Sequence, residues 1–469
     1  MSLCQPWLER DPKQVALSHA GQTLTWQVLD SQVAHYAKAL REQGVRSGEV
    51  VTLVGKNHLH TVLWFLACTQ VGALCTFVAP QPLALLQEKL ATLYAEQSPK
   101  HLWLAPSCAL SEEEIAELNA HRLSLPDERD ESVGGEKVSS QFSCEQLATL
   151  IFTSGSTGTP KAVTHTHQQH LASARGLLNK FAFTESDSWL LSLPLYHISG
   201  VAILYRWLAV GATLKIGTGD LQNDIAGVTH ASLVPTQLKR LLDSSSPLTL
   251  KRVLLGGSHI PVELAQMAAT RGIDTWLGYG MTEAASTVTA KRVDGLAGNG
   301  ELLDHRELRL VDGRIFIAGK TLAQGYYWQG QLVPLTNEQG WFDSKDLGRW
   351  QGNNLLIDGR ADNLFISGGE NVHCEEIEAV LNQHPHVQVA IVIPVQDSEF
   401  GARPVAVIRS EAEWCQAIGD TWCQAKLEKF KWPIMYFLLP DALLDGGIKV
   451  SRAAVKAWLA ANQTQFTPL

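Results

Sequence analysis

The chain has 469 residues, which at roughly 100–200 residues per domain is enough for about two to four domains. Its 47 acidic residues and 38 lysines and arginines give a formal charge of −9, which argues against a general nucleic-acid binder. With 45% hydrophobic and 18% charged residues, the composition is typical of a globular protein and excludes disorder over most of the chain.

The cellular setting is indicated by what the sequence lacks. No apolar run approaches the ~20 residues that a helix needs to span a bilayer, and the first residues do not resemble a signal peptide. Eight cysteines are scattered without a Cys-x-x-Cys pair, a distribution typical of reduced thiols. We therefore expect a cytoplasmic protein without a disulfide frame or a zinc site; the sequence leaves open whether it forms a homo-oligomer.

Short β-rich runs alternate with helical patterns between residues 15 and 290. We expect strands at 50–55, 73–78 and 101–105, and helices at 59–71 and 83–97. Further strands are expected at 147–153, 189–193, 212–216, 231–234, 253–255 and 274–277. This alternation predicts an α/β fold: a large N-terminal body of mostly parallel sheets flanked by helices.

The pattern changes near residue 300. Segments 307–310, 314–318 and 355–358 are typical of antiparallel strands joined by turns at 312–313 and 352–354, which predicts a small β-barrel-like part. A helix at 375–382 and strands at 387–394 and 405–409 then predict a small α+β unit. We place the boundary so that 1–361 is the body and 362–469 a mobile C-terminal domain. The polar segment 126–146 is expected to be a solvated linker.

The strongest chemical signal is the segment 152–161, Phe-Thr-Ser-Gly-Ser-Thr-Gly-Thr-Pro-Lys, which follows an apolar strand. Glycines allow backbone N–H groups to surround an anion, and the hydroxyls and Lys161 add further donors. The segment is not a Walker A loop, because Lys161 follows Pro160 and precedes Ala162. It predicts a phosphate-binding loop; the alternative is a flexible Ser/Gly turn.

This loop resembles that of the adenylate-forming superfamily of acyl-CoA ligases, luciferases and peptide-synthetase adenylation domains, although Ala162 stands where that family has Gly. Other motifs resemble those of the family in the same order. They lie at 278–283 (Gly-Tyr-Gly-Met-Thr-Glu), 341–348 (Trp-Phe-Asp-Ser-Lys-Asp-Leu-Gly), 358–362 (Asp-Gly-Arg-Ala-Asp), 366–372 and 449–452 (Lys-Val-Ser-Arg). The resemblance covers essentially the whole chain, most weakly before the loop.

The resemblance implies a two-step reaction. A carboxylate attacks the α-phosphate of ATP to give an acyl-adenylate and pyrophosphate, and a thiol then displaces AMP. ATP, Mg²⁺ and coenzyme A are therefore the implied cofactor and co-substrates. The residues implied to hold the phosphates are Thr153, Ser154, Gly155, Ser156, Thr157, Gly158 and Lys161.

The same resemblance implies the rest of the nucleotide site. Glu283 would bind Mg²⁺, a hard cation that prefers oxygen ligands, and Thr282 would contact the α-phosphate. Asp346 would accept hydrogen bonds from both ribose hydroxyls, and Arg360 would also reach the ribose. Residues implied to wall the adenine pocket are Gly256, Gly257, Ser258, Tyr279 and Gly280. For Tyr279 a place in the hydrophobic core remains the alternative.

The C-terminal motifs imply a moving lid. Lys449 is the implied catalytic lysine, because a compact ammonium can contact both the attacking carboxylate and the α-phosphate; the alternative is an ordinary surface lysine. Asp362 is the implied hinge. Gly368 and Gly369 are implied to leave room for the pantetheine of coenzyme A. The family pattern is broken by Ile448 for Gly before the lysine, by Lys345 for Gly before Asp346, and by His373-Cys374.

The segment 193–200 resembles the acyl-binding element of the family, in which His197 would lie beside the reacting carboxyl and Ser199 would line the acid site. Arg206 lies in an almost wholly apolar helical run, where a buried guanidinium is costly without an anion. It would bind a second carboxylate of the substrate, or else extend to solvent or pair with a protein carboxylate.

These features resemble the o-succinylbenzoate–CoA ligase branch, whose aromatic dicarboxylic acid substrate belongs to menaquinone biosynthesis. The alternatives are a ligase for another small aromatic or aliphatic acid and a non-catalytic AMP-binding module. The histidines at 165, 167 and 170 lack supporting acidic or thiol ligands, so we expect no metal site there.

Overall fold

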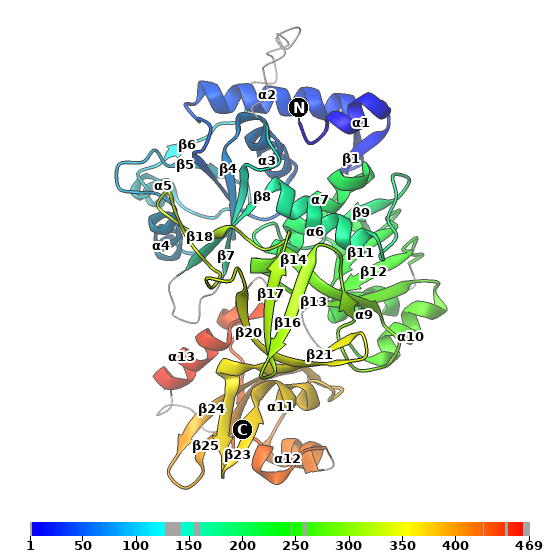
Figure 1. The fold of residues 1–469 in the computed structure, drawn as a ribbon, viewed down its shortest axis with the longest axis vertical. Coiled ribbons are helices and arrows are strands. Elements are labelled where there is room, and N and C mark those ends of the chain that lie inside the picture. Colours follow the sequence, from blue (N-terminus) through cyan, green and yellow to red (C-terminus); the bar gives the residue numbers. More distant parts are fainter. Residues whose placement is uncertain are drawn as a thin grey trace.

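The computed structural model describes residues 2–126, 142–153, 160–244, 246–256, 260–424, 426–445 and 449–462, with Asp445 and Lys449 described by their backbone alone. Two large sheets and their helices form the upper and central parts of the molecule in Figure 1, and the residues after 364 form its lower part. In the described ranges no helix combines the length and apolar character needed to cross a membrane.

The first large sheet has 8 strands, with a parallel half and an antiparallel half. Its order is β19 (Gln331–Val333), β18 (Gly325–Trp328), β8 (Lys161–Thr166), β7 (Leu147–Thr153), β4 (Leu74–Val78), β3 (Val50–Val54), β5 (His101–Leu104) and β6 (His121–Arg122). Neighbouring strands from β7 to β6 run parallel, whereas the hairpins β7–β8 and β18–β19 pair antiparallel with each other through β8 and β18. The β7–β8 hairpin flanks the predicted phosphate loop.

The second large sheet has 9 strands. Its order is β15 (Glu301–Leu302), β14 (Ser286–Arg292), β13 (Asp274–Met281), β12 (Arg252–Leu255), β11 (His230–Leu233), β9 (Ser188–Leu190), β10 (Thr213–Ile216), β1 (Val15–His19) and β2 (Gln22–Thr25). From β13 to β1 the strands are parallel, and antiparallel strands close both edges. The predicted mostly parallel architecture is confirmed.

Helices α3 (Leu59–Val71) and α7 (Ile198–Val210) are apolar on every side because they are buried on every side. They share the largest hydrophobic core with strands of both large sheets. Both end at a glycine in the left-handed conformation, Gly72 and Gly211. The other helices of this part are α1 (Gln5–Arg10), α2 (Trp26–Glu42), α4 (Leu83–Leu93), α5 (Glu112–Glu117), α6 (His167–Leu178), α8 (Leu221–Asp224), α9 (Pro235–Asp243) and α10 (Val262–Thr270).

Between the large sheets and the lower part lies a 4-stranded antiparallel sheet, which is the predicted small β part. It comprises β16 (Arg306–Val311), β17 (Arg314–Gly319), β20 (Phe342–Gln351) and β21 (Asn354–Arg360). The predicted turn at 312–313 is confirmed: both residues have positive φ, 51° and 76°, as a tight hairpin requires.

The C-terminal residues build a 5-stranded sheet with its own hydrophobic clusters. Its strands are β22 (Leu364–Ser367), β23 (Glu370–His373), β24 (Val387–Asp397), β25 (Gly401–Ser410) and β26 (Tyr436–Leu438). Helices α11 (Cys374–Leu381), α12 (Gln416–Gln424) and α13 (Arg452–Asn462) pack on it, and β27 (Leu444–Asp445) pairs with β28 (Lys449–Val450).

Two predicted elements are shorter in the structure. Helix α4 ends at Leu93 instead of 97, because the buried hydroxyl of Tyr94 bonds with Thr52 and donates to the carbonyl of Val50, which draws the chain into an extended conformation. Strand β9 ends at Leu190 instead of 193. Most of the polar segment predicted as a linker, 127–141, lies outside the described residues.

Candidate active site

The two ends of the predicted phosphate loop are fixed by the β7–β8 hairpin, in which Thr153 is paired with Lys161. Lys161 is the first residue of β8, and its Nζ lies 5.3 Å from the ring centre of Tyr326 on β18. The Tyr326 hydroxyl donates to Glu283 Oε1 over 3.3 Å. One tyrosine therefore contacts both the loop lysine and the predicted Mg²⁺ ligand. The predicted phosphate contacts Ser154, Gly155, Ser156, Thr157 and Gly158 lie outside the described residues.

Thr282 and Glu283 lie on a single 3₁₀ turn, Thr282–Ala284, at the end of β13. The fully buried ring of His165 lies against the backbone of this turn, and burial lowers its pKa to about 3. The ring is therefore neutral at physiological pH and supports the turn from β8, the strand that also carries Lys161. Within the described ranges no cluster of three or more metal-binding side chains occurs, either at His165, His167 and His170 or elsewhere.

Asp346 on β20 lies at the centre of a polar cluster. The Tyr279 hydroxyl donates to Asp346 Oδ2 over 2.5 Å, and Arg360 Nη1 donates to Asp346 Oδ1 over 3.2 Å. Asp346 and Arg360 are directly opposite each other on neighbouring strands. Burial raises the pKa of the Asp346 carboxyl, and the hydrogen bond from Tyr279 and the charge of Arg360 oppose that rise. The tyrosine thus belongs to the polar cluster through its hydroxyl while its ring packs against the core.

The glycines of the 278–283 motif are required by the packing of strand β13 on β14. A Cβ on Gly280 would lie 1.9 Å from the carbonyl oxygen of Ser286, and one on Gly278 would lie 2.6 Å from that of Thr289. The close approach leaves room for no side chain at either position. Gly256 follows β12 and is open on its Cβ side. The neighbouring predictions, Gly257 and Ser258, lie outside the described residues.

The predicted acid-binding side is formed by helix α7 and the segment before it. His197 is the N-cap residue, and its ring packs edge-on against Tyr196 at 4.8 Å. Ser199 lies in the first turn of the helix, and Arg206 lies two turns further along. His197 and Ser199 are half-buried, which leaves both side chains partly accessible.

Arg206 is buried, with only 3% of its surface exposed, so its guanidinium does not extend to solvent. Its Nη2 donates to Thr287 Oγ1 over 3.4 Å, and the guanidinium lies over the ring of Trp189. Within the described part of the chain no carboxylate forms an ion pair with it. Burial and the nearby charge of Arg306 lower the pKa of Arg206 to about 9. The sequence leaves three roles open for Arg206: extension to solvent, pairing with a protein carboxylate, or binding of a ligand anion. These contacts favour the last.

The predicted lid residues lie after β21. Arg360 forms a two-pronged ion pair with Asp362, over 2.8 and 3.0 Å. Gly368 and Gly369 have φ of 60° and 90° and form the β22–β23 turn, so the hairpin itself requires them. The backbone of Lys449 pairs with that of Asp445 where β27 meets β28; its side chain is not among the described atoms.

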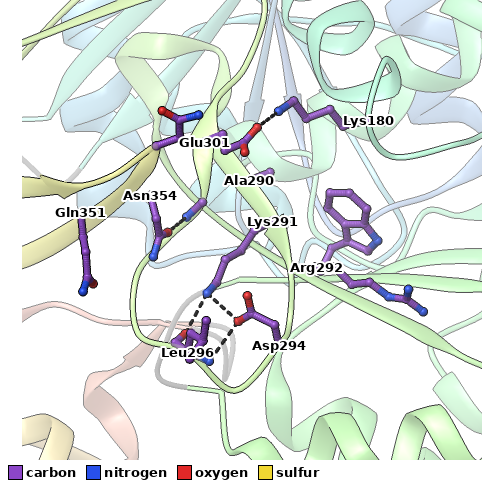
Figure 2. Close-up of a pocket in the computed structure, with 12 residues that line it drawn as sticks. Lys180, Ala290, Lys291, Arg292, Asp294, Leu296, Glu301, Gln351 and Asn354 are labelled. Carbon is purple, nitrogen blue, oxygen red and sulfur yellow. Dashed lines mark hydrogen bonds and ion pairs between the residues drawn. The ribbon is translucent and has the colours of Figure 1, made fainter.

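A separate pocket of about 600 Å³ opens beside β14 and β15, and none of the predicted site residues lines it (Figure 2). Its charged groups are neutralised locally: Lys180 pairs with Glu301, and Lys291 pairs with Asp294. We therefore place the candidate site at the Lys161–Glu283 and Tyr279–Asp346 clusters instead.

Tyr326 and Ser344 were not singled out by the sequence. The Ser344 hydroxyl accepts from the Asp346 backbone N–H and donates to the Ile315 carbonyl, which fixes the strand at Asp346. Tyr326 lies in none of the motifs, whereas Ser344 lies within the 341–348 motif, two residues before its aspartate, but no role was predicted for it.

Known proteins resemble this chain over nearly its full length. The 2-succinylbenzoate–CoA ligases of Salmonella typhimurium and Escherichia coli are 42% and 41% identical to it, each over 97% of this chain and 97% and 98% of their own. A variant of E. coli MenE with bound OSB-AMS has a TM-score of 0.86 at 40% identity, covering 97% of this chain and 98% of that one. A Bacillus subtilis o-succinylbenzoate CoA synthetase in complex with ATP and magnesium ion has a TM-score of 0.83 at 26% identity, covering 97% and 99%.

The family model described as AMP-binding enzyme matches residues 4–327, which include the phosphate loop, the 278–283 motif and the α7 segment. Together with the full-length relatives, this match shows that the chain belongs to the AMP-binding enzyme family, the adenylate-forming superfamily that its motifs resemble.

Proposed function

We propose that the chain is a 2-succinylbenzoate–CoA ligase. It converts o-succinylbenzoate and ATP to an acyl-adenylate and pyrophosphate, and it then transfers the acyl group to the thiol of coenzyme A with release of AMP, a step of menaquinone biosynthesis. The observation that carries the substrate assignment is the buried Arg206, which forms an ion pair with no carboxylate of the described residues, and relatives of that name support the assignment. The alternative is a ligase for another small aromatic or aliphatic acid, and a monocarboxylic acid of that kind would offer no second anion to Arg206.

The nucleotide is held by the clusters around Asp346 and Glu283. The Asp346 carboxylate accepts hydrogen bonds from the ribose hydroxyls, and Arg360 beside it also reaches the ribose. Lys161 and the loop before it bind the phosphates, and Thr282 contacts the α-phosphate. Gly256, Gly257, Ser258, Tyr279 and Gly280 wall the adenine pocket.

The residues around Glu283 fit a magnesium ion. Its carboxylate supplies a hard oxygen ligand and is held by one neutral hydroxyl, that of Tyr326, so its negative charge is not cancelled by an ion pair in the described chain. Bound Mg²⁺ would offset the negative charge of the phosphates. Lys161, whose Nζ lies over the Tyr326 ring, would add a positive charge to the same phosphates.

The acid lies along α7. Arg206 binds the carboxylate that is not activated, and His197 and Ser199 lie beside the carboxylate that attacks ATP. The second carboxylate of a dicarboxylic acid pairs with the buried guanidinium of Arg206, whereas a monocarboxylic acid leaves that buried positive charge without an anion.

The lid comprises residues 362–469 and the body residues 1–361. Asp362 is the hinge, Lys449 is brought to the attacking carboxylate and the α-phosphate in the first step, and the turn at Gly368 and Gly369 faces pantetheine in the second. All eight cysteines are unpaired, in keeping with a cytoplasmic location.

The test is a panel of carboxylic acids assayed for CoA thioester formation by the purified protein. We expect o-succinylbenzoate to exceed every other acid by at least ~10-fold in kcat/KM, about 1.4 kcal/mol of transition-state preference. A medium-chain acid or benzoate of equal efficiency would contradict the assignment. Acid-dependent ATP–pyrophosphate exchange separates either ligase from a non-catalytic AMP-binding module, which would show none.

A further inference from the structure

The side chain of Asn57 is bound entirely by the backbone of one distant segment, residues 191–195. Asn57 Nδ2 donates to the carbonyl of Leu191 over 3.1 Å and to that of Leu193 over 2.8 Å. The backbone N–H of Leu195 donates to Asn57 Oδ1 over 2.9 Å. Both ends of one amide therefore hold a five-residue stretch that belongs to no helix or strand.

This stretch joins the end of β9 to the start of α7, whereas Asn57 follows β3 in the other large sheet. The amide therefore ties the two sheets at the point where the acid-binding helix begins. It also accounts for the early end of β9, because the carbonyls of Leu191 and Leu193 bond to Asn57 instead of to a neighbouring strand.

The same stretch also packs against Gly200 in the first turn of α7. A Cβ there would lie 2.1 Å from the Pro194 carbonyl oxygen, so the stretch packs directly on the helix backbone. The His197 N–H donates to the same Pro194 carbonyl over 3.1 Å. The position of His197 therefore depends on the path that Asn57 imposes on residues 191–195.

We propose that Asn57 is a positioning residue for the acid-binding step: it fixes residues 191–195 and through them His197 at the start of α7. This inference depends on the proposed function, because it takes the α7 side to be the acid side. Only an amide supplies both the donors and the acceptor at this site; the isosteric carboxylate of aspartate would face two carbonyl oxygens without a hydrogen to donate.

The test compares Asn57→Asp with Asn354→Asp. Asn354 makes the same kind of clamp beside the pocket in Figure 2, donating to the Ala297 carbonyl over 2.6 Å and accepting from the Gly300 N–H over 2.8 Å. The same substitution there disturbs an equivalent backbone clamp on β21, a strand of the 4-stranded sheet. Wild type must first form the thioester of o-succinylbenzoate with ATP and coenzyme A; failure at that stage would concern the proposed function alone.

For Asn57→Asp we expect KM for the acid to rise at least ~10-fold, with KM for ATP changed less than twofold. Asn354→Asp should change neither. In a His197→Ala background the Asn57→Asp effect on the acid should shrink by more than half, because both changes act on one segment. Equal losses for acid and ATP, no loss, or the same loss in Asn354→Asp would overturn the proposal. Should Asn57→Asp not fold, Asn57→Ser is judged by the same criteria.

Discussion

Tyr279 and Asp346, which lie 67 residues apart, are joined by a hydrogen bond of 2.5 Å from the phenol to the carboxylate. Burial and the charge of Asp346 raise the pKa of Tyr279 well above its ordinary value, so the phenol remains a donor at every physiological pH. The carboxylate thus has a fixed orientation before any nucleotide binds, so binding loses no side-chain conformational entropy at Asp346.

Replacing Asp346 by asparagine should weaken ATP use while leaving the acid site intact. An amide lacks the negative charge, and one of its two polar atoms cannot accept the ribose hydroxyls. We expect kcat/KM for ATP to fall by about 100-fold, or ~2.7 kcal/mol, in line with hydrogen bonds to charged groups. Asp358→Asn on the neighbouring strand, where Asp358 pairs with Arg349, is the control. Equal losses in both variants would remove Asp346 from the ribose site.

Glu283→Gln should alter the magnesium requirement. Glutamine retains an oxygen that can accept the Tyr326 hydrogen bond but loses the charge that attracts a divalent cation. The Mg²⁺ concentration for half-maximal acid-dependent pyrophosphate exchange should rise by at least ~10-fold, about 1.4 kcal/mol. Glu301→Gln, which removes the partner of Lys180, should leave the requirement unchanged. An unaltered Mg²⁺ titration in Glu283→Gln would refute the assignment.

Arg206→Met should remove the preference for a dicarboxylate. A hydrogen-bonded charge contributes roughly 1.5–3 kcal/mol, so kcat/KM for o-succinylbenzoate should fall by about 10- to 150-fold. An analogue without the second carboxylate should lose less than ~3-fold, since methionine fills the same apolar surroundings. A similar loss on both acids would show that Arg206 has a structural role instead.

Lys449→Ala should impair the first step only. An ammonium that steadies the attacking carboxylate and the α-phosphate is worth about 10²–10³-fold in rate, and we expect adenylate formation to fall by that factor. Thioester formation from supplied acyl-adenylate and coenzyme A should continue at nearly the wild-type rate. Lys456→Ala on the exposed face of α13 serves as control. Undiminished adenylation in Lys449→Ala would exclude this lysine from the reaction.

Acid should destabilise the fold through the buried histidines beside the phosphate loop. Burial lowers the pKa of His165 and of His167 to about 3 from an ordinary value of 6.5. The unfolded chain therefore binds more protons than the folded one below pH 6.5, and stability falls as pH falls from 6.5 toward 3. At pH 5 each histidine would contribute about 2 kcal/mol of this loss, from 1.36 kcal/mol per pKa unit.

The measurement is the free energy of unfolding between pH 8 and pH 5. In His167→Gln the slope of the unfolding free energy against pH, between pH 6.5 and pH 5, should fall by the equivalent of about one bound proton. Loss of the contact with Tyr205 should in addition lower stability at pH 8. Replacing the exposed Gln168 of helix α6, which carries no titratable group, by alanine should leave the slope unchanged. A slope that His167→Gln does not alter would contradict the expectation.

Local patterns predicted the sheets and helices well because alternation and apolar runs reflect burial directly. Helix 59–71 and strand 147–153 coincide with α3 and β7. The ends of α4 and β9 were not predictable, because Tyr94 and Asn57 terminate them through partners roughly 40 to 140 residues away. Motif order placed Tyr279, Asp346 and Arg360 in one site, and the structure brings them together. The contact of Tyr326 with Lys161 and Glu283 could not be predicted, since it depends on the pairing of β18 with β8, two strands that are far apart in the sequence.

The guanidinium of Arg360 is shared between two carboxylates: one prong reaches Asp346, and the others reach Asp362. A sugar that occupies the Asp346 oxygens must compete with this arginine, and a released Arg360 can give all its donors to Asp362. If Asp362 is the hinge, as proposed, the nucleotide-bound and empty states would differ in how firmly Arg360 holds the first residue of the lid, and this one side chain would couple nucleotide binding to rotation of the lid.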